Sequence, residues 1–147
     1  RELEVVNITN PSSPSIVGSF NASGDSDSQS IDGTGNIVVL GRNSGHTHVI
    51  NVSNPSSPTQ LAYYDADDDT EDIDIYVGAE ATYAFLGTDE SSREFQVLNI
   101  TTPSSTNLVG SLNVANQING IAYHEGKDRV FAASEADNAE FMVFGPQ

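Results

Sequence analysis

The chain alternates short apolar runs with polar, turn-forming segments. The apolar runs are rich in valine, isoleucine, leucine and aromatic residues, and glycine, proline, asparagine or aspartate separates them. They recur about every ten residues, and no segment repeats its apolar positions with the 3.6-residue period of a helix. This pattern predicts an all-β protein, with a weaker strand at residues 28–32 and clear strands near Val5, Ile16, Val38, Val49, Ala62, Ile75, Phe85, Val97, Val109, Ile121, Phe131 and Val143.

A proline-containing segment occurs three times along the chain. Residues 7–14 (NITNPSSP) recur as residues 51–58 (NVSNPSSP) and, with changes, as residues 99–106 (NITTPSST), at separations of 44 and 48 residues. A repeat of this length corresponds to one supersecondary unit. Four short strands in each unit are typical of a propeller blade.

The ends of the sequence show where in the repeat the chain starts and stops. Residues 1–6 match residues 93–98, and residues 140–144 match the same strand once more. The sequence therefore predicts a single β-propeller repeat domain over residues 1–147, with repeats near 1–46, 47–92 and 93–147. It would hold three four-stranded antiparallel repeats of about 44–48 residues and one extra strand. Three blades are too few for a ring, so we expect a larger ring or assembly.

The matching strands also predict a common register. Val5, Val49, Val97 and Val143 stand at equivalent places, and we expect all four to be buried between adjacent sheets. The proline segments should form stiff turns, because proline cannot donate to a strand ladder and asparagine and serine side chains bond the nearby backbone.

The repeated stretch at residues 5–20 resembles the LVIVD repeat, and the resemblance recurs at residues 49–64 and 97–112. It implies a β-propeller of the kind found in surface or secreted proteins of bacteria and archaea. Asn7, Asn51 and Asn99 stand where that family often has aspartate. The final residues, 140–147, are similar to the C-terminal ends of LVIVD passengers that follow pilin-like N-termini.

Charge narrows the range of partners. The chain has 21 acidic and 5 basic residues, a formal net charge of −16. Such a surface repels nucleic acid and anionic membranes, so we expect neither nucleic-acid binding nor membrane insertion. There is no cysteine, which excludes disulfides and thiolate chemistry. The sequence begins at Arg1 without a methionine, and we expect it to be a processed or excised part of a longer chain.

The loops between strands carry most of the candidate chemistry. In a propeller, the loops at residues 21–27, 42–46, 65–72, 88–93, 113–116 and 135–139 should share one face, and variable loops commonly carry function. Asp65, Asp67 and Asp69 alternate as calcium ligands do. Thr70 and Tyr76 stand where an EF-hand has glycine and glutamate, so the loop is not an EF-hand. Calcium is the one cofactor that the sequence suggests, and none is required; the alternative is a solvated acidic loop.

Two further groups of side chains need an interpretation. His46 and His48 are two residues apart on a predicted strand, so both should point to one face of it. The two interpretations are a pair of metal ligands and a polar junction between loop and strand. Four glycosylation sequons begin at Asn7, Asn21, Asn51 and Asn99. Turn capping also explains the three in the repeat, so Asn21 is the first candidate for a glycan.

No catalytic residue can be assigned. The sequence has no cysteine, no serine elbow and no glycine-rich phosphate loop, and nothing pairs two carboxylates for acid–base work. We therefore expect a non-enzymatic, extracellular or cell-surface module for display, adhesion or assembly, including the exposed part of a pilin-like or filament-forming protein. Its partners would be copies of itself, further blades, or a surface glycan or protein. The alternatives are a calcium- or glycan-dependent binding module on the acidic loop face, and a fragment of a larger propeller enzyme.

Overall fold

The computed structural model describes residues 1–24, 27–114 and 116–145. Residues 25, 26 and 115, which belong to two of the expected loops, lie outside it. The described residues form thirteen strands, each near a position that the sequence predicts: β1 (Leu3–Asn7), β2 (Ser15–Phe20), β3 (Ser28–Thr34), β4 (Ile37–Arg42), β5 (His46–Asn51), β6 (Thr59–Asp65), β7 (Thr70–Val77), β8 (Thr82–Thr88), β9 (Phe95–Asn99), β10 (Asn107–Leu112), β11 (Ile118–His124), β12 (Arg129–Ser134) and β13 (Phe141–Phe144).

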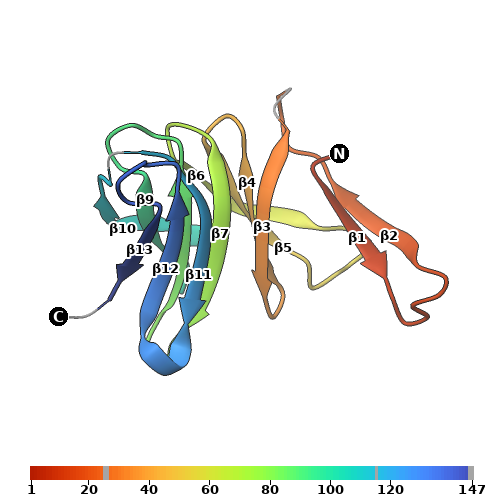
Figure 1. The fold of residues 1–147 in the computed structure, drawn as a ribbon. Helices are drawn as coiled ribbons and strands as arrows, with labels where there is room; N and C mark the ends of the chain where they lie inside the picture. Colours follow the sequence, from red (N-terminus) through yellow and green to blue (C-terminus); the bar gives the residue numbers. More distant parts are fainter. Residues whose placement is uncertain (25–26, 115, 146–147) are drawn as a thin grey trace.

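The strands form four antiparallel sheets, which confirms the all-β prediction. Two sheets have four strands, in the orders β3-β4-β5-β6 and β7-β8-β9-β10; the others are the β1-β2 hairpin and the three-stranded β11-β12-β13 sheet. The inner strands β3, β7 and β11 lie beside one another, and the hairpin and the β11–β13 sheet stand at opposite ends of the row (Figure 1). Each four-stranded sheet follows the chain from its inner to its outer edge, as in a propeller blade.

The repeat in the sequence is offset from the sheets in space. β1, β5, β9 and β13 are all third strands of a blade, because each has the same place in its sheet or the same register with its neighbours. The described chain therefore begins and ends on a third strand, as the matching segments predict. We call the strands of a blade first to fourth, from the inner edge outward.

Two local features recur in the repeats. In all three pairings of a third with a fourth strand, the register shifts by one residue, next to Val5, Val49 and Gly110 respectively. In the first two proline turns, Asn10 Oδ1 and Asn54 Oδ1 each accept bonds from the hydroxyl and backbone N–H of the serine two residues later, at 2.8 and 3.3 Å. The third turn has Thr102 instead and forms a short 3₁₀ helix, η1 (Pro103–Ser105).

Three apolar clusters fill the spaces between neighbouring sheets. The largest, between β3–β6 and β7–β10, includes Val39, Val49, Ile73 and Leu98. A second, between β7–β10 and β11–β13, contains Phe95, Ile118 and Ile121 together with partly buried Val97, and a small third one holds Leu3 against Leu40 and Ile50. The core is thus a series of interfaces between sheets. Each sheet therefore needs a neighbouring sheet against both of its faces.

The predicted burial of the four equivalent valines is wrong for Val143. Val49 is fully buried, Val97 is partly buried and packs against its cluster, and Val5 is partly buried, whereas Val143 is 52% exposed. Val143 faces away from β7–β10, and no described sheet lies beyond β11–β13. The predicted register is correct. Val143 is exposed because burial also requires a second sheet against its face of β13.

A second difference concerns the start of β7. Residues 65–72 were expected to form a loop, but β7 begins at Thr70. Thr70 is buried, pairs with Thr88 and lies 3.0 Å from Thr47 through the two hydroxyl oxygens. Contacts with two neighbouring strands extend β7 into a segment whose local sequence is polar. A second short 3₁₀ helix, η2 (Glu125–Lys127), fills the turn expected after Tyr123.

Candidate functional site

The loops that the sequence placed on one face do meet there in the described structure. Backbone bonds link the loops of successive strands: Asn43 N–H to Asp27 O at 3.0 Å, Ala66 N–H to Gly45 O at 2.8 Å, and Asp89 N–H to Asp69 O at 3.0 Å. We call the surface formed by these loops the acidic loop face. The main chain thus links four of these loops in series, from residues 21–27 to residues 88–93.

The three calcium candidates lie in one loop but have different surroundings. Asp65 accepts a hydrogen bond from the backbone N–H of Asp67 at 3.1 Å. Asp67 has a positive φ of 70° and forms an ion pair with Arg93. Asp69 is instead close to the charges of Asp68 and Asp89. Among the described residues, no three His, Cys, Asp or Glu side chains gather into a group that could hold a metal ion, so calcium binding here stays a prediction.

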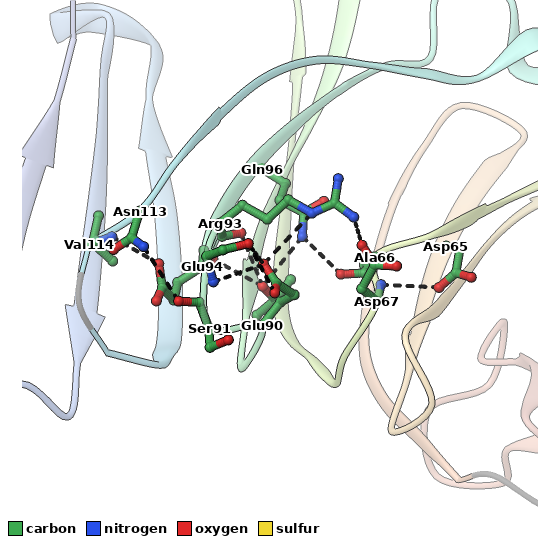
Figure 2. A network of polar contacts seen from close by, with 12 residues as sticks. Asp65, Ala66, Asp67, Glu90, Ser91, Arg93, Glu94, Gln96, Asn113 and Val114 are labelled. Atoms are coloured by element: carbon green, nitrogen blue, oxygen red, sulfur yellow. Dashed lines mark hydrogen bonds and ion pairs between the residues drawn. The ribbon is translucent and has the colours of Figure 1, made fainter.

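Arg93 links the second complete sheet to the first (Figure 2). Its guanidinium pairs with Asp67, lies 3.7 Å from Glu90 and donates to the Tyr64 hydroxyl at 3.3 Å. The Tyr64 hydroxyl in turn donates to Gln96 Oε1 at 2.8 Å. Because Arg93 neutralises Asp67, that carboxylate is the one of the three candidates whose charge is already paired.

Gln96 continues the same network into the core. Its amide nitrogen donates to the Ala66 carbonyl at 3.1 Å, and the whole side chain is buried. At the other side of the loop, the Glu94 carboxylate accepts the backbone N–H of Val114 at 2.9 Å (Figure 2). The sequence did not single out these residues. Glu2 is the equivalent of Glu94 in the repeat, and it accepts the Ala22 N–H at 2.8 Å. A comparison of the repeats would therefore have identified this glutamate.

A different set of carboxylates approaches one another across the loops. Burial raises the pKa of Asp69, and the charges of Asp68 and Asp89 raise it further. Burial likewise raises the pKa of Asp89, with added repulsion from Asp68 and Glu135. These carboxylates come from three separate loops, which is why their spacing in the sequence did not reveal the group.

Replacing Asp89 with asparagine should raise the melting temperature at pH 7 by about 1 °C, the effect of relieving repulsion between exposed charges. A carboxyl group with a raised pKa binds its proton more tightly in the folded state, so its charge destabilises the fold as pH rises through that pKa. The gain should therefore shrink as pH falls through the raised pKa of Asp89, because protonation removes the charge that the neighbouring carboxylates repel.

Thermal melts at several pH values check this prediction. Glu80→Gln is the matched control, because it removes the same charge from the turn between β7 and β8, where Glu80 is exposed. An equal gain in both variants would mean that only net charge matters and that the carboxylate group has no local effect.

The two histidines share one face of β5, as predicted. Their rings lie 6.4 Å apart, next to Phe20 and Tyr63. His48 is buried; its Nδ1 lies 2.8 Å from Gln60 Oε1, while its Nε2 has no partner among the described atoms. Burial lowers the pKa of His48. The pair forms part of the contact between the β1–β2 hairpin and the next sheet.

The repeat sequons cap turns. The side-chain oxygens of Asn7, Asn51 and Asn99 accept the backbone N–H two residues later, at 2.9, 2.8 and 2.9 Å. Asn21 is exposed, and its amide nitrogen donates to the adjacent carbonyl of Ala22 at 3.5 Å. Glycosylation at any of the four stays a prediction, and Asn21 is still the first candidate.

Inner-strand aspartates connect successive sheets. Asp32 Oδ2 accepts the N–H of Ile75 at 2.7 Å, and Asp74 Oδ2 accepts the N–H of Tyr123 at 2.6 Å. Asp32 and Asp74 have equivalent registers, and Ala122 is the third member of the series. Burial and the nearby Asp32 raise the pKa of Asp74. These bonds hold the row of blades together along its inner edge.

Large apolar side chains are exposed at the two ends of the row, where their equivalents inside the row are buried. Ile31 on β3 is 54% exposed, whereas its equivalent Ile73 is 4% exposed; Phe141 on β13 is 66% exposed, whereas its equivalent Phe95 is 8% exposed. We call the outer face of β11–β13, with Phe131, Phe141 and Val143, the C-terminal open face. The face of β3 that carries Ile31, beside the β1–β2 hairpin, is the N-terminal open face. Each face exposes at least one large apolar side chain whose equivalent is buried between two sheets.

Among the described residues, no helix is long and apolar enough to cross a membrane. The model for the LVIVD repeat matches residues 1–22 and 27–66. No curated protein matches the chain by sequence.

Solved structures resemble the whole fold. The β-propeller domain of Cps50 (Swd1) from Myceliophteria thermophila has 13% identity and a TM-score of 0.71, over 99% of this chain and 50% of that one. The computationally designed Ika8 protein has 17% identity and a TM-score of 0.69, over 90% of this chain and 37% of that one. The designed Ika4 protein has 10% identity and a TM-score of 0.53, over 89% and 98%. This chain therefore spans half or less of the first two structures.

Proposed function

Because this chain carries LVIVD repeats and folds as β-propeller blades, we propose that it is a non-enzymatic module for assembly and display outside the cell. It associates with further blades through its two open faces, and the acidic loop face stays in contact with solvent. The main support is the contrast in exposure between equivalent positions, such as Ile31 and Ile73.

The exposed apolar side chains of the open faces support an assembly role. Large apolar side chains are exposed at both ends, while their equivalents form the apolar clusters between the sheets. Contiguous exposed apolar surface marks interaction sites in soluble proteins, and on the C-terminal open face Phe131 and Phe141 stack on each other at 5.9 Å between ring centres. The inner edge of β1 and the outer edge of β13 also have no strand neighbour among the described residues, and unpaired edges favour pairing with another chain.

The charge of the chain supports display in solvent and predicts how association depends on salt. A net charge of −16 makes copies repel one another. At 0.1 M salt, repulsion between charges more than about 10 Å apart is largely screened, and more salt shortens this distance. Apolar contacts do not weaken with screening. Association through the open faces should therefore strengthen as sodium chloride rises.

Light scattering on the 147-residue chain tests the proposal. At micromolar concentration we expect a mass above that of one 15.6 kDa chain, rising between 0.1 and about 1 M salt. The variant Phe141→Ser, which makes the most exposed aromatic of the C-terminal open face polar, should lower that mass while the circular dichroism spectrum stays β-type. A folded monomer in all of these conditions would refute the assembly role.

A further inference from the structure

The two ends of the row are complementary in strand order. The β1–β2 hairpin occupies the third and fourth places of a blade, and no described strand takes the first two. The β11–β12–β13 sheet occupies the first three places, and no described strand takes the fourth. One sheet from each end would supply every strand of one blade. They would supply the third place twice, once by β1 and once by β13.

The two open faces also match in shape. A hollow of about 300 Å³ lies on the C-terminal open face and is lined by Ile121, Phe131 and Phe141 among others. At the internal interfaces, the equivalents of Ile31 fill this place: Ile73 packs against Val39 and Val49, and Ile121 lies in a cluster with Phe85 and Val97. Ile31 of another copy is therefore the side chain that would enter the hollow.

Side chains along the inner edge agree with this junction. At the internal interfaces, Phe85 stacks on Tyr123 at 5.5 Å between ring centres; at the proposed one, Phe131 would meet Gly33, so a large residue meets the smallest. Ala122 replaces the aspartate that binds the next inner strand, but the N–H of Gly33 already donates to its own Asp32 at 2.7 Å. The backbone N–H of Gly33 therefore does not need a carboxylate at position 122 as its acceptor.

One position indicates that the junction is slightly wider than the internal ones. A Cβ at Gly41 would lie 2.7 Å from Thr70, and one at Gly87 would lie 2.5 Å from Ile118. Their equivalent in the last sheet is Ala133, which would face Ser28, the smallest of the three inner-strand residues. A modestly larger separation between the sheets accommodates the methyl group, and the large rings of Phe131 and Phe141 fill the added space.

The duplicated third strand decides how the two copies join. β13 is held by β12 and by Phe144, which stacks on Phe95 at 4.5 Å between ring centres. Among the described strands β1 pairs with β2, and it is held further by Leu3, which packs in the small third cluster. Phe141 would take the place of Leu3 with a larger apolar side chain, whereas Met142 and Phe144 already pack in the second cluster of their own copy. Competition for the place beside β2 therefore favours β13.

We propose that two copies of this chain form a ring by strand exchange. The β11–β13 sheet of each copy docks on the N-terminal open face of the other, and β13 displaces β1 from the edge of β2. Each copy then contributes three blades, so two copies close a ring of six, within the usual range of about four to eight, whereas three copies would exceed it. This inference rests on the proposed assembly role and adds the partner and the strand that is exchanged.

Engineered cysteines test the exchange, because the chain has no cysteine of its own. Glu4 is opposite Ser19 in the hairpin, and Met142 has the register of Glu4 in its sheet. In the double variant Ser19→Cys, Met142→Cys, mild oxidation should yield a disulfide-linked dimer on a non-reducing gel. In Glu4→Cys, Ser19→Cys, oxidation should lock β1 onto β2 within one chain and weaken association at least tenfold, with recovery after reduction.

The outcomes separate the two proposals. If the oxidised Glu4→Cys, Ser19→Cys variant associates as tightly as its reduced form, strand exchange is wrong and the assembly role stands. If the single variant Met142→Cys forms the same cross-linked dimer, the copies dock symmetrically through β13 and the exchange is again wrong. If the unmodified chain stays monomeric at high salt, the assembly role itself fails. Circular dichroism of each reduced variant confirms that it is folded.

Discussion

Replacing Leu98 with alanine will lower the free energy of unfolding by about 2–5 kcal/mol, the range found when a buried leucine leaves a cavity. Leu98 is fully buried in the largest apolar cluster, between the two complete sheets. The rigid strands on both sides can move little to fill the space, because each is held in a ladder. Urea unfolding followed by circular dichroism measures the loss.

The repeat supplies a matched control for this change. Val6 stands at the equivalent place on β1, where it is 45% exposed. Its replacement by alanine should cost less than about 1 kcal/mol, because little apolar surface is returned to water. Similar losses for Leu98→Ala and Val6→Ala at low protein concentration would mean that the hairpin is covered in solution, or that Leu98 is not in the core.

Replacing Gly87 with alanine will destabilise the protein by about 1–3 kcal/mol, the usual cost of inserting a methyl group into a packed interface. The new Cβ would lie 2.5 Å from the Ile118 side chain and 2.9 Å from its carbonyl oxygen. The second of these contacts is with the backbone of β11, so a change of rotamer cannot relieve it. The sheets β7–β10 and β11–β13 must separate instead.

Gly110→Ala is the control, because it makes the same chemical change in an open place. Its Cβ would meet Val97 at 4.0 Å, an ordinary contact, and the loss of chain entropy in the unfolded state should leave stability unchanged or slightly improved. Urea midpoints of the two variants give the comparison. If Gly87→Ala proves as stable as Gly110→Ala, Ile118 on the inner strand β11 does not lie in close contact with Gly87 on β8.

Local sequence carried most of the information on the strands. Glycine, asparagine and proline break the apolar runs because of their own backbone preferences, which need no distant partner. Asn7, Asn51 and Asn99 cap the same turn three times for that reason. The repeat then revealed the strand order, because equal segments take equal places in a blade.

The sequence predicted the candidate site less completely than it predicted the strands. Asp65, Asp67 and Asp69 were found by their spacing, but their partners come from other loops: Arg93 pairs with Asp67, and Asp89 approaches Asp69. Such contacts depend on which loops become neighbours when the sheets pack. A pattern confined to one loop carries no record of them.

The sequence by itself determined that the chain is all-β, that it is built from propeller repeats, and that it begins and ends on a third strand. Only the tertiary structure decided which equivalent positions are buried. Val49 and Val143 have the same register, yet one is fully buried and the other 52% exposed. Register is set by hydrogen bonds within one sheet, whereas burial requires a second sheet against the same face.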